Sequence, residues 1–334
     1  MGDNVLTFEK EFARYCSAKR CIGVNSGESA LQLALLACDI GPGDEVITVP
    51  FTFIGTANAI IHIGAKPVFV DCELKTYNID ARLLKEAITS KTKAIIPVHL
   101  FGHPADMDPI NEIADEHGLW VITDAAEAHG ARYKGRMIGS LGHLSCFSFY
   151  PTKNITCLGD GGAVVTSVED LAEKLLMFRD CGRSGSNRYE HAVIGYNKRM
   201  SEISAAILRV QLKHLDNWND RRREVASRYR EEIVGVVHPF EAPWAYHTYY
   251  LYVVRSDKRD ELKGFLGKRA VETGIHFNPI HLQPCYMEMG FHEGMFSMSE
   301  KLHKEVLSLP MHANLTKEEV DYVIATTNSF TKSS

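Results

Sequence analysis

The chain has 334 residues, of which 45% are hydrophobic and 24% are charged, and its formal net charge is −5. This length allows one large domain and a smaller one, while the negative charge argues against a general nucleic-acid-binding role. No apolar run is long enough to span a bilayer and no signal-peptide pattern opens the chain, so we expect no membrane segment.

The eight cysteines form no CxxC pair and no zinc-finger spacing. Several lie inside apolar strand or helix patterns, which predicts reduced thiols in the core. Reduced thiols are typical of a reducing compartment, so we expect a cytoplasmic protein. The histidines form no helical or hairpin metal pattern, and we predict no metal site.

Apolar strands alternate with amphipathic helices through the first part of the chain. This alternation predicts an α/β fold with a mostly parallel sheet and helices on both faces. Ligands of such sheets bind beyond the carboxyl ends of the strands, where Ser26, Phe53 and Asp124 stand. After a helix at 6–16, the predicted strands are 21–24, 45–49, 67–70, 94–98 and 120–123, and the helices between them begin near Ser26 and cover 56–63, 81–88 and 107–117.

In the second part of the chain, a helix at 168–181 and a polar loop lead to one long predicted helix that begins at Ser201 and continues past Trp218. We expect residues 1–218 to form a large domain and residues 219–334 a small α+β domain. The run Arg221 to Arg223 is predicted to be a solvated helix face. The small domain is predicted to contain strands at 249–254 and 307–310 and helices at 261–273 and 318–329.

One lysine stands on a turn between two apolar strands. The stretch from Phe147 to Asn154 carries Lys153, and a glycine-rich reversal at 159–162 leads into the second strand. An isolated loop lysine is more often a solvated side chain. A turn between buried strands, however, fixes the direction of the ammonium group, and low-dielectric surroundings lower its pKa. Both are requirements of a lysine that forms a Schiff base.

Further groups at strand ends complete what pyridoxal phosphate needs. Asp124 can keep the pyridine nitrogen protonated, and Phe53 can stack on the ring. The helix start Ser26-Gly27-Glu28, together with Ser148, can bind the phosphate. Taken singly, each of these residues also fits a simpler role: Asp124 as a helix cap, Phe53 as a core residue, and Ser26 as an ordinary cap that binds nothing.

The order of these residues resembles the DegT family of sugar aminotransferases, which are fold-type-I pyridoxal-phosphate enzymes. The resemblance covers nearly the whole chain and implies a large cofactor-binding domain with a small C-terminal domain. It is carried by Asn25-Ser26-Gly27 with Ala30-Leu31, Gly41 to Ile47, Pro50 to Phe53, Asp124 to Ala131, Phe147 to Phe149 with Lys153-Asn154, Gly159 to Ala163, Gly195 to Asn197, His276 to Pro284 and Leu307 to Pro310.

The resemblance implies a role for each matching position around the cofactor. Lys153 matches the Schiff-base lysine that also moves the proton, and Asp124 matches the partner of the pyridinium nitrogen. Phe53 occupies the stacking position. The positions that match phosphate-binding residues are Gly27, Glu28 and Ser148.

Other matching positions concern a partner subunit and the substrate. Asn197 matches an asparagine that reaches the phosphate in the neighbouring subunit, which implies a homodimer with shared active sites. Arg199 matches a basic residue that holds the amino donor's carboxylate or the sugar nucleotide, and His281 lies in a segment that resembles part of the substrate wall. Arg183 and Arg188 are candidates for contact with a pyrophosphate, with an exposed loop as the alternative.

Three features depart from the family pattern. Position 127 is often a glutamine that contacts the phenolic oxygen of the cofactor, so Glu127 must be protonated or point elsewhere, because two anions repel each other. Position 28 is usually threonine, so Glu28 offers the phosphate only its backbone N–H. The chain begins where family members have already passed an N-terminal helix and loop, so we expect a substrate pocket that is incomplete or differently built.

The residues and the resemblance together predict a pyridoxal-phosphate-dependent aminotransferase. An amino acid, L-glutamate, loads the cofactor, and the amino group goes to carbon 3 or 4 of a nucleotide-linked keto-deoxysugar, with segments 151–154 and 159–162 leaning toward carbon 3. The sugar and the nucleotide stay open. One alternative is a non-catalytic regulator or binding protein of the same fold, against which Lys153 and Asp124 argue. A nicotinamide dehydrogenase would need a GxGxxG turn after the first strand, which is missing.

Overall fold

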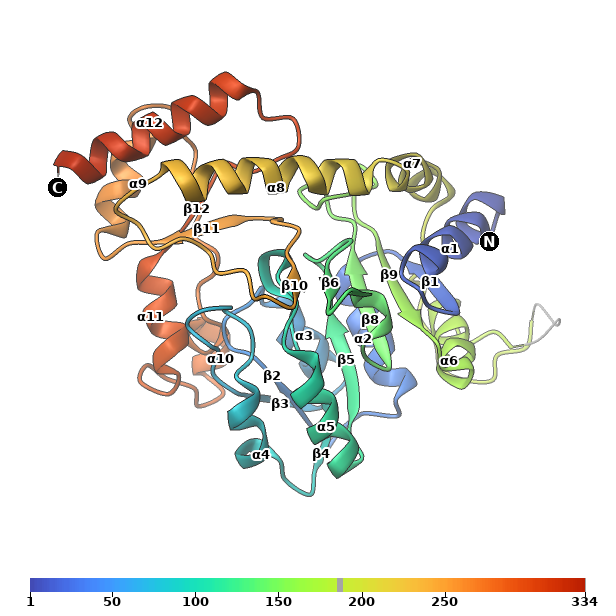
Figure 1. The fold of residues 1–334 in the computed structure, drawn as a ribbon. Helices are drawn as coiled ribbons and strands as arrows, with labels where there is room; N and C mark the ends of the chain where they lie inside the picture. The colour runs from blue at the N-terminus through green and yellow to red at the C-terminus, as the bar shows by residue number, and fades with distance from the viewer. Residues whose placement is uncertain (185–188, 334) are drawn as a thin grey trace.

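The structure is a computed structural model that describes residues 1–184 and 189–333 (Figure 1). A seven-stranded sheet forms the centre of the larger part, in the order β1-β9-β8-β5-β4-β2-β3. Strand β9 is antiparallel to β1 and β8, and the pairs from β8 to β3 are parallel, so the predicted mostly parallel sheet is confirmed. The strands are β1 (Arg20–Val24), β2 (Glu45–Thr48), β3 (Lys66–Phe69), β4 (Thr92–Ile95), β5 (Trp120–Asp124), β8 (Leu144–Ser148) and β9 (Gly162–Thr166).

Helices cover both faces of this sheet. Successive strand residues alternate between two core clusters: Val46 belongs to the cluster that includes residues of helix α2, whereas the next residue, Ile47, belongs to the cluster that includes residues of α1 and α5. A strand that is buried on both sides reads as a continuous apolar run, which is why the pattern predicted strands so well. The helices of this part are α1 (Asp3–Tyr15), α2 (Gly27–Ala37), α3 (Gly55–His62), α4 (Leu84–Ala87), α5 (Met107–His117) and α6 (Glu169–Arg179).

The long helix predicted from Ser201 is wrong, because the chain forms two helices there. Helix α7 (Glu202–Leu212) ends before Lys213, and α8 (Leu215–Glu232) begins after His214. Helix α7 packs against α1, while α8 crosses the molecule to its other part (Figure 1). Neither glycine nor proline marks the break, so tertiary packing overrides the helical pattern at this point.

The smaller part has a core of its own, formed by α8, two strands and the last helices. Its buried residues include Tyr229 of α8, Tyr252 and Leu307. The predicted strand at 249–254 begins only at Tyr252, because Tyr249 has a positive φ of 46°. The domain boundary at residue 218 stays a prediction, and α8 spans that position. The elements are β11 (Tyr252–Arg255), antiparallel to β12 (Val306–Leu309), with α9 (Arg259–Gly267), α10 (Pro284–Met287), α11 (Ser297–Glu305) and α12 (Lys317–Ser333).

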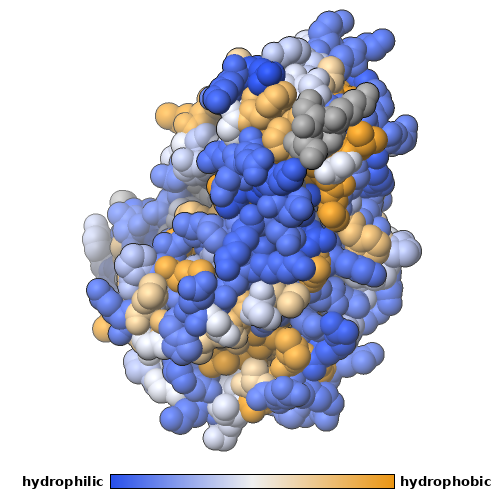
Figure 2. Space-filling view, turned by 90° about the vertical axis from the view of Figure 1, so that its left-hand side faces the viewer, coloured by the Kyte–Doolittle hydropathy of each residue, from blue (hydrophilic) through white to orange (hydrophobic). Residues whose placement is uncertain are grey.

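The two parts also meet in a small three-stranded sheet of order β10-β6-β7. Strand β10 (Ala245–Tyr246) pairs with β6 (Arg132–Tyr133), which pairs in turn with β7 (Arg136–Met137). The segment after α8 therefore returns to the larger part of the molecule before it enters β11. The face that carries α10 and α11 is mostly hydrophilic, with separate hydrophobic patches (Figure 2).

The arginine run on α8 is not the solvated face that the sequence predicted. Arg222 is only 6% exposed, and Arg223 forms an ion pair with Glu241. Arg221 pairs with Glu224 at the surface. The prediction failed because three consecutive helix residues point in different directions, so one of them must face inward if any side of the helix is buried.

Six of the eight cysteines are buried as free thiols, Cys181 is half-buried and Cys285 is exposed. The prediction of reduced core thiols is therefore confirmed for most of them. Burial raises the pKa of Cys38 to about 12, which keeps its thiol protonated. Within the described ranges, no helix combines the length and the apolar character that crossing a bilayer requires.

Candidate active site

Lys153 lies in the turn that follows β8, and its amine is held from two sides. The backbone N–H of Lys153 donates to the carbonyl of Tyr150 at 2.9 Å, which closes the turn. Its Nζ lies 3.1 Å from Oε1 of Glu127 and 4.2 Å from the centre of the Tyr250 ring. The side chain is 12% exposed. The turn thus presents one amine at the carboxyl edge of the sheet, as the sequence predicted.

The predicted lowering of the lysine's pKa is wrong for this state of the protein. Burial lowers the pKa of Lys153. The charge of Glu127, the effect of Tyr250, the hydrogen bond between the amine and Glu127, and the charge of Asp124 together outweigh burial and raise the pKa above its ordinary value. Glu127 also accepts a hydrogen bond from the N–H of Phe101 at 2.9 Å. The sequence pattern indicates the low-dielectric surroundings of Lys153 but not the carboxylate that lies beside its amine.

Asp124 is the last residue of β5, and its carboxyl group is buried with two hydrogen bonds. Its Oδ2 accepts from the hydroxyl of Thr56 at 2.7 Å, and its Oδ1 accepts from the N–H of Ala126 at 3.1 Å. Residues 125–131 form turns rather than a helix, so Asp124 is not a helix cap. Burial raises its pKa, although the bond from Thr56 works against that rise. The charges of Lys153 and Glu127 act on Asp124, which puts all three groups in one site.

The start of α2 and the end of β8 approach each other closely. Ser26 caps the helix, because its hydroxyl accepts from the N–H of Ser29 at 3.1 Å. A Cβ added to Gly27 would lie 2.7 Å from Cβ of Ser148, so only glycine fits beside that serine. The carboxylate of Glu28 turns away to His62, 3.1 Å from its Nδ1. The helix start and Ser148 therefore lie close together, while the binding of an anion there stays a prediction.

Phe53 is an exposed aromatic residue at the end of the segment that follows β2. Its side chain is 60% exposed, and its ring centre lies 6.2 Å from that of Phe277. Large aromatic residues are usually buried, so a ring left open at a strand end is the informative case. The alternative that Phe53 is a core residue is wrong.

Asn197 and Arg199 lie on a segment that runs beside the start of α2. The N–H of Asn25 donates to the carbonyl of Lys198 at 3.1 Å, and Nζ of Lys198 lies 3.0 Å from the hydroxyl of Ser29. Arg199 forms an ion pair with Asp180, and Asn197 is exposed. The role of Asn197 toward a neighbouring subunit stays a prediction.

The predicted contacts of Arg183 and Arg188 with a pyrophosphate also stay predictions. Arg183 lies 3.4 Å from Oδ2 of Asp180, and Arg188 lies outside the described residues.

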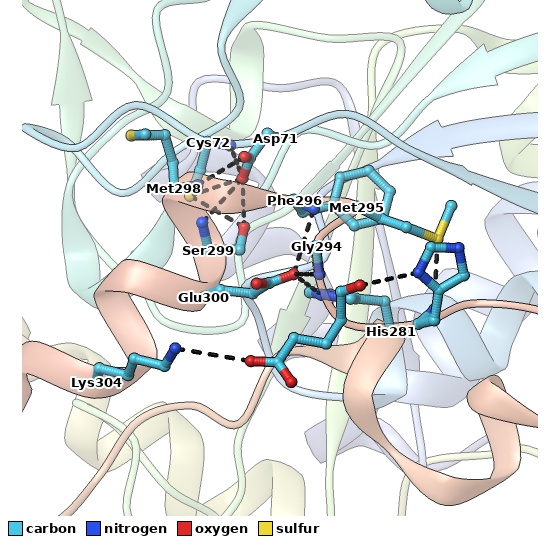
Figure 3. A network of polar contacts seen from close by, with 12 residues as sticks. Asp71, Cys72, His281, Gly294, Met295, Phe296, Met298, Ser299, Glu300 and Lys304 are labelled. Atoms are coloured by element: carbon cyan, nitrogen blue, oxygen red, sulfur yellow. Dashed lines mark hydrogen bonds and ion pairs between the residues drawn. The ribbon is translucent and has the colours of Figure 1, made fainter.

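His281 is fully buried, and its role toward a substrate stays a prediction. It lies in the short 3-10 turn Ile280–Leu282 with no exposed surface, and its Nε2 is 3.0 Å from Oε1 of Glu300 on α11. The same oxygen accepts from the N–H of Gly294 at 2.7 Å. Figure 3 shows this network beside Asp71, which holds the start of α11. The segment around His281 is therefore held against α11 by hydrogen bonds to Glu300.

Several residues of the site escaped the sequence reasoning. Thr56 stands at the predicted start of a helix, so the sequence indicates that it lies near a strand end. The sequence does not indicate its hydrogen bond to Asp124. Tyr250 contacts both Lys153 and Thr152, whose Oγ1 lies 2.9 Å from the tyrosine hydroxyl. No sequence signal identifies Tyr250, because it comes from the smaller part of the chain.

A cavity of about 480 Å³ lies away from these residues, between segments 74–77 and 237–241. Among its basic side chains, Arg255 lies 3.2 Å from Glu305, Arg230 donates to the hydroxyl of Tyr249, and Lys75 lies over the ring of Phe240. None of the site residues named above lines it. The chemistry of the protein is therefore expected at the open edge of the sheet rather than in this cavity.

The residues at the sheet edge fit pyridoxal phosphate. The narrow cradle between Gly27 and Ser148 offers N–H and hydroxyl donors to a phosphate. Phe53 offers an uncovered ring face, Asp124 a buried acid, and Lys153 an amine that can form a Schiff base. Within the described chain, no cluster of three or more histidine, cysteine or acidic side chains could hold a metal ion.

Comparison with known proteins agrees with this arrangement. Residues 1–328 match the DegT/DnrJ/EryC1/StrS aminotransferase family. The chain belongs to this family. It is 47% identical over 330 residues to the pleiotropic regulatory protein of Geobacillus stearothermophilus, a match that covers 97% of the chain and 88% of that relative. It is 44% identical to the dTDP-3-amino-3,4,6-trideoxy-alpha-D-glucose transaminase of Streptomyces venezuelae, covering 97% of the chain and 86% of that enzyme.

A crystal structure of DesV from S. venezuelae, in complex with a ketimine intermediate, superposes on the fold with a TM-score of 0.96. It is 44% identical, and the match covers 99% of this chain and 90% of that one. The protein is thus a pyridoxal-phosphate-dependent aminotransferase of the DegT family. The prediction of family, fold and enzyme class from the sequence is confirmed.

Proposed function

We propose that the protein transfers an amino group from L-glutamate to a keto group of a nucleotide-linked deoxysugar. The observation that carries the proposal is the Lys153 amine, held beside Glu127 in one site with the buried acid Asp124. The name of the Streptomyces relative, a transaminase of a dTDP-linked 3-amino sugar, supports a sugar nucleotide and favours carbon 3 as the aminated position.

When bound, pyridoxal phosphate supplies an electron sink for the carbon that loses or gains a proton. Asp124 would hold a proton on the ring nitrogen, and Phe53 would offer its ring face to the cofactor. The N–H groups of Gly27 and Glu28, with the hydroxyl of Ser148, would bind the phosphate at the positive end of α2. Lys153 would move the proton, with its neutral form as the active base.

Glu127 stands close enough to Lys153 to take part in this proton movement. With the amine charged, the two groups form an ion pair at 3.1 Å. Through this ion pair, Glu127 would orient the Lys153 amine that moves the proton.

The proposal includes a homodimer with shared active sites. Asn197 is exposed beside the start of α2, where it is free to reach across an interface, and Arg199 on the same segment is proposed to meet the amino donor's carboxylate or the sugar nucleotide. Ile203 and Val210 on α7 are 75% and 60% exposed, two turns apart on one helix face. An open apolar stripe of this kind suits burial against a second copy.

His281 has a supporting place in the proposal. Because its side chain is buried against Glu300, we assign it to holding the substrate wall and not to touching the substrate. The buried free thiols favour the reducing cytoplasm as the location of the reaction.

The test is to incubate purified protein with pyridoxal phosphate, L-glutamate and a panel of 3-keto and 4-keto sugar nucleotides, with mass spectrometry of the products. We expect one aminated sugar nucleotide and stoichiometric 2-oxoglutarate, and no product from Lys153→Ala. The absence of an aminated product with every keto sugar, while the cofactor absorbance still shifts with glutamate, would redirect the search to another amino acceptor.

A second candidate is a regulatory protein, because one relative at 47% identity carries a regulatory name. The intact set of Lys153, Glu127 and Asp124 favours catalysis, since a binding function does not need a buried amine beside two acids. Cofactor absorbance that no amino acid changes would favour the regulatory candidate.

A further inference from the structure

Helix α8 carries two buried polar side chains on the face that it turns toward the active site. Asn219 and Arg222 are three residues apart, hence neighbours on that face, and they are 1% and 6% exposed. Figure 1 shows α8 crossing above the central sheet from α7 to the smaller part of the molecule. Buried polar side chains on a helix need partners, and here most of the partners belong to segments that carry residues of the site.

Asn219 joins the two loops that meet at the lysine. Its Oδ1 accepts from Nδ2 of Asn154 at 2.8 Å, and its Nδ2 donates to the carbonyl of His129 at 2.9 Å. Asn154 follows Lys153 directly, and His129 is two residues after Glu127. A single amide therefore fixes the distance between the turn that carries the amine and the loop that carries its carboxylate partner.

The packing around Asn219 leaves little freedom. Gly130 has a φ of 82°, and a Cβ added there would lie 2.6 Å from Nδ2 of Asn219. Only glycine allows the loop to approach the helix so closely. The loop after β5 is thereby pressed against α8 at the point where the amide holds it.

Arg222 holds the third component of the site. Its Nη1 donates to the carbonyls of Met311 at 3.0 Å and of Tyr249 and Tyr250 at 3.4 Å. Among the described residues its hydrogen-bond partners are these main-chain carbonyls, and no carboxylate pairs with it. Burial lowers the pKa of Arg222 to about 10. A buried cation without an anion is costly to keep, which indicates that its position has a use beyond stability.

We propose that Asn219 and Arg222 are positioning residues that hold the Lys153 turn, the Glu127 loop and Tyr250 at fixed distances from one another. Asn219 sets the contact between the amine and Glu127, and Arg222 sets the Tyr250 ring against the same amine. The inference rests on the proposed function, in which Lys153 is the proton carrier. The charged and titratable groups that act on Lys153 include Glu127, Tyr250 and Asp124, and the charge of Lys153 also acts on His129 and His276.

The test measures the amine itself in cofactor-free protein, so that it does not depend on activity. Lys153 is modified with trinitrobenzenesulfonate across a pH series, and the rate is followed by mass spectrometry of the peptide that contains it. Because Glu127 raises the pKa of Lys153, a loosened loop lets that pKa fall. We expect the midpoint to move down by about half a unit or more in Asn219→Ala and Asn154→Ala.

The matched control is Tyr229→Phe on the same helix. It removes the bond from the Tyr229 hydroxyl to the carbonyl of Pro310 at 3.0 Å, which ties α8 to the smaller part without touching the lysine. We expect a similar loss of thermal stability and no change in the lysine midpoint. Arg222→Met is a further variant, because replacing a buried charge by an apolar side chain of similar volume is often tolerated. It is expected to lower kcat about tenfold with KM for the amino donor nearly unchanged.

Equal midpoints in wild type, Asn154→Ala, Asn219→Ala and Tyr229→Phe would overturn the inference and leave α8 a purely structural helix. A change in midpoint together with an inactive wild-type protein would support the positioning role and reject the proposed reaction instead. Asn154→Ala keeps the measurement possible where Asn219→Ala does not fold, because it removes the same hydrogen bond and leaves the helix unaltered.

Discussion

At the scale of single residues, the site depends on one close pair of opposite charges. The amine of Lys153 and the carboxylate of Glu127 are 3.1 Å apart, and both side chains are nearly closed off from solvent. In the cofactor-free protein this pair keeps the lysine charged and therefore unreactive as a nucleophile. Binding of the cofactor must first release a proton from the lysine, so the pair makes cofactor capture dependent on pH.

The variant Glu127→Gln removes the charge that raises the pKa of Lys153 and keeps the side-chain shape. The neutral amine then persists at lower pH, so cofactor capture by the apoprotein is expected to reach its half-maximal rate about one pH unit lower or more. Stopped-flow absorbance of pyridoxal phosphate binding across a pH series measures this. Glu116→Gln, which breaks an exposed ion pair with Lys85, is the control and should leave the profile unchanged.

The variant Asp124→Asn is expected to change stability and activity in opposite directions. Burial raises the pKa of Asp124 in the folded state, so the acid weakens folding increasingly as the pH rises from its unfolded-state pKa to its folded-state pKa, and the full loss of stability is reached above the latter. In the cofactor-free protein at pH 8, the variant is expected to melt roughly 2 °C or more above wild type, with a gap that narrows as the pH falls. Calorimetry across pH checks this, and a variant that melts lower at pH 8 contradicts it.

The same variant is expected to lose most of its activity. A unit charge about 4 Å away in a partly buried site contributes about 4 kcal/mol, so losing it slows turnover by roughly two to three orders of magnitude. Steady-state rates with the loaded enzyme measure the loss. Activity close to that of wild type would mean that Asp124 does not face the ring nitrogen.

At the scale of elements, the order of strands and helices in the larger part was predictable because their apolar periods are regular and uninterrupted. The strand ends at Asp124 and Ser148 and the helix start at Ser26 followed from the same pattern. The contacts of Tyr250, Thr56 and Asn219 did not, since each depends on two segments far apart in sequence. The break between α7 and α8 was also not predictable, because it is determined by tertiary packing and not by the local sequence.

Helix α11 illustrates an element whose start is fixed from a distance. Phe296 at its N-cap position provides no capping side chain, and Asp71 takes over that task. The Asp71 carboxylate accepts from the N–H groups of Met298 at 2.8 Å and Ser299 at 3.0 Å and from the Ser299 hydroxyl at 2.6 Å (Figure 3). The helix that supports the buried His281 is thus fastened to the loop after β3.

Asp71→Ala leaves the start of α11 uncapped. The free energy of unfolding is expected to fall by about 2 kcal/mol, because several charge-assisted hydrogen bonds are lost at once. Urea denaturation measures the change, with Asp257→Ala in an exposed turn as the control. A loss no larger than that of the control would show that the helix start finds other partners.

At the scale of the whole molecule, the proposed shared site can be tested by mixing two inactive variants. Lys153→Ala lacks the amine, and Asn197→Asp sets a carboxylate against the phosphate. If Asn197 serves the site of the neighbouring subunit, mixed dimers contain one fully intact site, and co-refolded protein should recover about a quarter of wild-type activity. If Asn197 serves its own subunit, every mixed dimer stays inactive. Each variant refolded alone is the control.

The uneven distribution of sulfhydryl groups offers a labelling handle. Six are enclosed in the interior and protonated, whereas Cys285 stands uncovered in α10, one residue from its beginning. A maleimide fluorophore at neutral pH is therefore expected to attach to Cys285 first, because accessible thiols react ahead of enclosed ones. Such a dye would report movements of the α10 segment during turnover while leaving the reacting amine unmodified.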